Sequence, residues 1–110
     1  MSKHNVTITL RQMLDYAQTA VTLSRGRKRN DLDKDITFNL ALTRSIEIIE
    51  EAANRVPDEF QDAHTEIPWI EIIGMRNRLI HGYDEVDFDF LWNVVRNDLP
   101  SLIKQLNKIL

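Results

Sequence analysis

The chain has 110 residues, of which 43% are hydrophobic and 28% charged, and its formal net charge is -3. This composition is that of a folded protein and gives no reason to expect disorder. The length predicts a single domain over residues 1–110. The negative net charge disfavours a general nucleic-acid binder, which usually has a basic excess. The absence of cysteine excludes disulfide scaffolds, thiolate metal sites and cysteine nucleophiles.

The first predicted element is a helix from Thr9 to Arg25, because apolar side chains recur there at the three-and-four spacing of one helix face. Gly26 is a natural place for it to end. A turn follows with four basic side chains, which are either solvated or guide a phosphate backbone; they are Arg25, Arg27, Lys28 and Arg29.

A second long helix is predicted from Asp31 or Asp35 to Arg55, and Pro57 should end it. Carboxylates at its start favour the positive end of the helix dipole. Its buried seam should consist of Phe38, Leu42, Ile46, Ile49, Ala52, Ala53 and Val56.

Residues 57–67 are predicted to form a short helix or turn and then a loop, and Pro68 suits the first turn of a third substantial helix that continues to His81. Asp87 is the expected cap of the last helix, which Pro100 should kink or restart. The pattern predicts an all-α fold, an up-down bundle of four to five helices.

The third helix carries a charge on its apolar side. An ideal helix places Arg76 in the middle of Trp69, Ile72, Ile73, Leu79 and Ile80. A guanidinium there needs a partner, an interface or a cleft. It either makes a structural ion pair with Glu47, Glu50 or Glu51, or it lies in a functional groove. His81, one turn after Asn77, is either a helix-end histidine stabilised by the dipole or a catalytic one.

The segment GMRNRLIHGY, residues 74–83, resembles the signature of the HepT-like proteins of the HEPN superfamily. In that family the motif is Arg, any four residues, His, any residue, Tyr, which Arg76, His81 and Tyr83 match. The resemblance includes the preceding Pro68 and Trp69 and extends to IEIIEEA in the second helix and RNDLPSL in the last.

The resemblance implies a HEPN-like bundle that cleaves RNA without a metal as a homodimer, with two such helices facing each other across a cleft. Histidine titrates near neutral pH and suits proton transfer, while arginine suits phosphate. We therefore expect His81 to shuttle protons and Arg76 to bind phosphate. Asn77 would position either group.

The family likeness also implies a toxin whose Tyr83 receives adenylate groups from a nucleotidyltransferase antitoxin of the MntA type. A second interpretation is a non-catalytic companion subunit of a nucleotidyltransferase that holds nucleotide or RNA. No cofactor or metal is expected, because the histidines are far apart in the sequence and lack helical pairing. Without a signal peptide or an apolar run of about 20 residues, we expect a cytoplasmic protein that does not enter the membrane.

Overall fold

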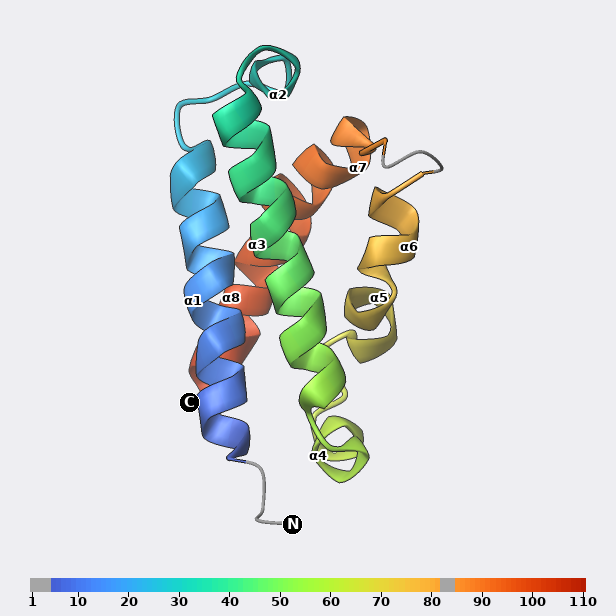
Figure 1. Cartoon of the computed structure of the whole chain (residues 1–110). Helices are drawn as coiled ribbons and strands as arrows, with labels where there is room; N and C mark the ends of the chain where they lie inside the picture. The colour runs from blue at the N-terminus through green and yellow to red at the C-terminus, as the bar shows by residue number, and fades with distance from the viewer. Residues whose placement is uncertain (1–4, 82–84) are drawn as a thin grey trace.

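The computed structural model describes residues 5–81 and 85–110, and in that part of the chain it is an all-α bundle, as predicted (Figure 1). Two long antiparallel helices, α1 (Val6–Ser24) and α3 (Ile36–Arg55), lie side by side along the molecule and are joined through the short α2 (Asp31–Lys34). The bundle measures 43 × 30 × 22 Å along its principal axes.

The remaining elements pack against this pair. After α4 (Asp58–Ala63), α5 (Trp69–Ile73) and α6 (Met75–Leu79) lie against α3. The final helical segment, called the last rod below, consists of α7 (Phe88–Asn93), the π-helical turn η2 (Val94–Asp98) and α8 (Leu99–Ile109). Its α8 packs on α1. Buried side chains from α1, α3, α6, α7 and α8 meet in the core. They include Met13, Ala17, Leu42, Ile49, Leu79, Leu91 and Leu106.

Side-chain caps set the starts of both long helices. The Asn5 side chain accepts a hydrogen bond from the Ile8 amide at 3.3 Å, so α1 begins three residues before the predicted Thr9. Asp35 accepts one from the Phe38 amide at 3.1 Å and separates α3 from α2, which the sequence left open. The predicted seam of α3 is confirmed, since every one of its residues from Phe38 to Val56 is buried.

The third helix differs from the prediction in two ways. It is broken at Gly74, which closes α5 and opens α6, and it ends at Leu79 rather than at His81. Ile80 is extended and forms an isolated antiparallel bridge with Val86. This pairing competes with the next helical turn, so the predicted helix end was wrong.

The last rod largely follows the prediction. Asp87 caps α7 by accepting a hydrogen bond from the Phe90 amide at 3.0 Å. Pro100 lies in the first turn of α8, directly after η2. Because proline has no amide hydrogen to donate, a π-helical turn followed by a restarted helix accommodates it.

Candidate functional site

The helical segment formed by α5 and α6, the α5–α6 rod, is anchored largely by the side chains that the sequence predicts, with Met75 added. Trp69, Ile72, Met75 and Leu79 are buried, and the Trp69 indole donates a hydrogen bond to the His64 carbonyl at 2.9 Å. Arg76 therefore lies at the margin of the apolar side and is 56% exposed. The expectation that it sits in the middle of that side was wrong, because Met75 occupies the inward position.

Arg76 is held by a carboxylate of α3. Its Nη1 lies 3.0 Å from Oε2 of Glu47, which is only 19% exposed and also lies 3.6 Å from Arg44. Burial raises the pKa of Glu50, and the positive charge of Arg76 opposes that rise. The structure thus selects Glu47 among the three candidate partners. More than half of the Arg76 side chain remains exposed.

His81 lies beyond α6 in a segment whose two arms are joined by backbone hydrogen bonds. The His81 amide donates to the Glu85 carbonyl at 2.7 Å, and the Asp87 amide donates to the Leu79 carbonyl at 2.8 Å. The imidazole is 55% exposed, and its Nε2 lies 3.4 Å from Oδ2 of Asp87. His81 therefore does not lie at a helix end, which was one of the two alternatives for it.

The carboxyl of Asp87 has two partners. The Phe90 amide, the α7 cap contact, and more weakly His81 hold the pKa of Asp87 below its ordinary value, against a smaller opposing effect of burial. The sequence predicts Asp87 as a helix cap but does not predict its contact with His81. The only available signal was a carboxylate six positions after a motif histidine, and loops do not have a fixed geometry at that spacing.

The other predicted site residues are placed as follows. Asn77 is exposed on α6, directly after Arg76. Arg76 contacts α3 and His81 contacts Asp87, so the two motif side chains have different partners within one copy. Tyr83, the predicted adenylylation site, lies outside the described residues.

Two of the basic side chains after α1 take part in structural contacts. Arg27 lies 2.8 Å from Asp35 and stacks over the Phe38 ring, and Arg29 lies 2.6 Å from Asp89. These contacts favour a structural role for the turn over a role in guiding RNA. Arg25 and Lys28 remain exposed there.

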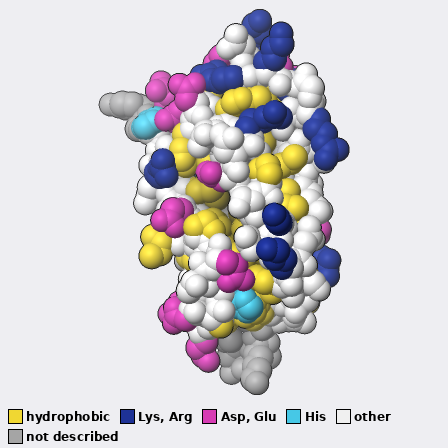
Figure 2. Space-filling model, turned by 180° about the vertical axis from the view of Figure 1, so that it is seen from behind, with side chains coloured by type: hydrophobic (Ala, Val, Ile, Leu, Met, Phe, Trp, Pro, Cys, Tyr) yellow, Lys and Arg dark blue, Asp and Glu magenta, His cyan; other side chains and the backbone are white. Residues whose placement is uncertain are grey.

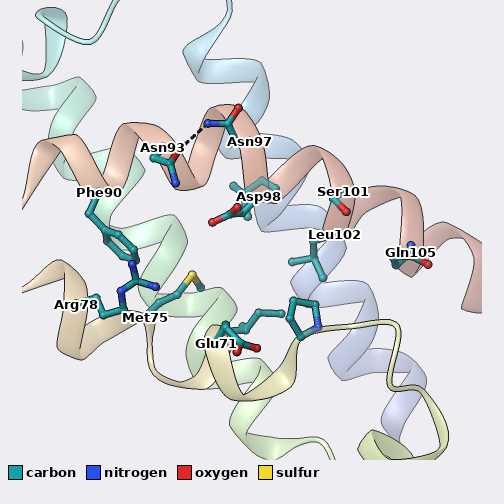
Figure 3. A pocket seen from close by; sticks show the side chains of 13 residues that line it. Glu71, Met75, Arg78, Phe90, Asn93, Asn97, Asp98, Ser101, Leu102 and Gln105 are labelled. Carbon is teal, nitrogen blue, oxygen red and sulfur yellow. Dashed lines mark hydrogen bonds between the residues drawn. The ribbon is translucent and has the colours of Figure 1, made fainter.

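A separate groove of about 590 Å³ lies between α5–α6 and the last rod (Figure 3). Figure 2 shows this face of the molecule, with hydrophobic atoms along its middle. Arg78 stacks over Phe90 in this groove with its guanidinium carbon 4.5 Å from the ring centroid, and burial raises the pKa of Asp98 there. The lining includes neither Arg76 nor His81. The sequence signal that was missed is a polar series at four-residue spacing, Asn93, Asn97, Ser101 and Gln105.

Comparisons with known proteins identify relatives of the chain. A family model described as Ribonuclease HepT-like matches residues 13–109. A protein of Caldanaerobacter subterraneus subsp. tengcongensis, named as a candidate RNase, is 37% identical over 101 residues, which are 92% of this chain and 90% of that protein. A protein of Thermococcus cleftensis, named as a candidate ribonuclease HepT, is 44% identical over 77 residues, 70% of this chain and 68% of that protein.

A further relative, from Methanocaldococcus jannaschii and also named as a candidate RNase, is 31% identical over 106 residues, 96% of this chain and 97% of that protein. No solved structure matches the chain. Within residues 5–81 and 85–110, none of the helices combines the length and apolar character needed to cross a membrane.

Proposed function

Because the chain belongs to the HepT-like ribonuclease family, we propose that it is a metal-independent endoribonuclease and the toxin of a cytoplasmic toxin–antitoxin pair. The observation that carries the proposal is the placement of the motif side chains within the region that the family model matches. Arg76 and His81 are both more than half exposed, and each has one carboxylate partner, Glu47 and Asp87. A charged phosphodiester can therefore reach both groups.

The proposed reaction is attack of a ribose 2′-oxygen on the adjacent phosphorus. The new P–O2′ bond forms as the P–O5′ bond breaks, which leaves a cyclic phosphate and a 5′-hydroxyl. His81 takes the proton of the 2′-hydroxyl, and a second acid gives a proton to the departing O5′. Arg76 donates hydrogen bonds to the phosphoryl oxygens as their charge builds, and Asn77 positions the phosphate or the histidine.

A homodimer would provide the second acid, because each copy brings one motif histidine. The exposed side of α3 supports this arrangement. Ile36 is 70% exposed and Leu40 60% exposed, and both lie within about 40 degrees of Glu47 around the helix axis. These two exposed apolar side chains form a strip on the same side of α3 as Glu47, about two to three helical turns before it, and fit a surface covered by a second copy.

Regulation by a partner is the second part of the proposal. A nucleotidyltransferase antitoxin would attach adenylate groups to the Tyr83 hydroxyl. Tyr83 is two residues from His81 in the sequence. Added phosphates near the histidine would repel and block an RNA phosphate.

Incubation of the purified protein with RNA in the presence of a chelator tests the nuclease. We expect cleavage by the natural chain and a fall of about 10²- to 10⁴-fold in His81→Ala, which is the range that general acid–base catalysis contributes. His64→Ala is the matched control. It removes an imidazole that stacks on Phe60, outside the proposed site, and it should cleave normally.

The same experiment separates the two interpretations of the family. RNA that is bound but left intact by the natural chain would overturn the nuclease and favour the companion-subunit interpretation. That interpretation is consistent with the net charge of -3. Equal cleavage by the natural chain and His81→Ala would overturn the role of His81.

A further inference from the structure

The segment between α6 and α7 is closed so that its two ends meet. Leu79 and Asp87 are joined by a backbone hydrogen bond of 2.8 Å, Ile80 and Val86 form a bridge, and the His81 amide donates to the Glu85 carbonyl. These backbone pairs, called the stem below, join residues 79–81 to residues 85–87. They bring the Asp87 carboxylate next to His81, six positions earlier in the sequence. The pair is therefore set by the backbone and does not depend on the chance meeting of two surface side chains.

We propose that Asp87 is the positioning residue of His81: its carboxylate accepts a hydrogen bond from Nε2–H, orients the ring, and leaves Nδ1 to act on the RNA. The contact that carries this inference is Nε2 to Oδ2, at 3.4 Å. The inference rests on the proposed function for its catalytic meaning. The pairing itself can be tested without any RNA.

Asp87 is well suited to this role because its other oxygen is already engaged. Oδ1 accepts the Phe90 amide at 3.0 Å, and this cap restricts rotation of the carboxyl group. Oδ2 then faces the imidazole. An imidazole whose one nitrogen donates to a carboxylate is held in a single tautomer, and its positive form is stabilised when the other nitrogen takes a proton.

Among residues 5–81 and 85–110, the other charged groups of the neighbouring elements do not duplicate Asp87. Arg76 pairs with Glu47, Arg78 stacks on Phe90, and Asp89 pairs with Arg29. Glu85 engages the segment through its backbone carbonyl, which accepts the His81 amide. Asp87 is the carboxylate that the structure places against His81 among the described residues.

Asp87→Asn separates the positioning role from the capping role, because asparagine also caps helices well. We expect the variant to fold with nearly unchanged stability. Its cleavage rate should fall about ten- to a hundred-fold, less than the loss expected on removing the histidine. Asp89→Asn removes a carboxylate from the same helical turn and should change none of these readouts.

Two further measurements decide whether Asp87 acts through His81. Nitrogen-15 spectra of the RNA-free protein should show neutral His81 protonated at Nε2, and the Nε2-protonated fraction should fall in Asp87→Asn, whose side-chain amide nitrogen donates where Oδ2 accepts. Adding Asp87→Asn to His81→Ala should cause no further loss of cleavage. An unchanged tautomer, or equal losses in the two backgrounds, would overturn the inference. If the natural chain cleaves no RNA, the nuclease proposal fails, while the spectra still test the pairing.

Discussion

Arg76 combines a structural contact with an accessible guanidinium, and the size of each effect separates the two roles. Its ion pair with Glu47 is more than half exposed on the arginine side. Exposed ion pairs typically contribute about 0–1 kcal/mol to stability. A donor aimed at a developing oxyanion contributes much more to rate, about 10²- to 10³-fold. Removal of the Arg76 side chain should therefore reduce the cleavage rate far more than the stability of the fold.

Arg76→Ala should lose about 10²- to 10³-fold in RNA cleavage, because the phosphate loses its hydrogen-bond donor. The free energy of unfolding, measured by urea titration, should fall by about 1 kcal/mol or less. Arg44→Ala is the matched control, since Arg44 also lies beside Glu47 and is 60% exposed. A large loss of stability without loss of cleavage would make Arg76 a structural residue.

Single-residue chemistry was predictable where it depended on residue type and not where it depended on tertiary contact. The sequence limited the partner of Arg76 to Glu47, Glu50 or Glu51. Only the placement of α6 against α3 selects Glu47. The contact of His81 with Asp87 depends on the closure of a segment, and no helical period predicts that.

At the scale of elements, the helices that carry a regular apolar period were the predictable ones. The buried seam of α3 repeats over its whole length, and Asp35 and Pro57 mark its ends. The α5–α6 rod is short and broken at Gly74, and its inward side changes with Met75. Helix propensities are weak and local, so the sequence alone does not predict that break or the helix end at Leu79.

The cluster around the start of α3 should make the fold sensitive to acid. The pKa of Asp35 lies below its ordinary value because the Phe38 amide and then Arg27 bind its charged form, and the pKa of Asp31 is lowered chiefly by the Lys28 amide. A depressed folded pKa stabilises the fold above the unfolded value of about 3.9. That stability is lost as pH falls through the folded pKa.

Thermal unfolding between neutral pH and about pH 3 should show a smaller fall in Tm for Asp35→Asn than for the natural chain. Asparagine keeps the cap but has no charge to lose. Asp62→Asn, on the exposed side of α4, should follow the natural chain. Identical acid sensitivity in all three proteins would show that Asp35 does not contribute to it.

At the scale of the whole molecule, the exposed strip on α3 gives the proposed homodimer a location. Leu40→Asp places a charge on that strip and should shift the protein from dimer to monomer in sedimentation velocity, with a parallel loss of cleavage. Ile8→Asp changes an exposed isoleucine on α1 and should leave the dimer intact. A natural chain that is monomeric and still cleaves RNA would contradict the supply of a second histidine by a partner copy.

The backbone stem between Leu79 and Asp87 has a consequence for evolution. Because its backbone pairs set which residues stand opposite one another, a shift of one residue within either arm would separate His81 from Asp87. A descendant that gained one residue there could retain both His81 and Asp87 and still move them apart. Insertions among descendants should therefore be rarer in the two arms than in exposed turns, such as the one at Arg25 and Gly26.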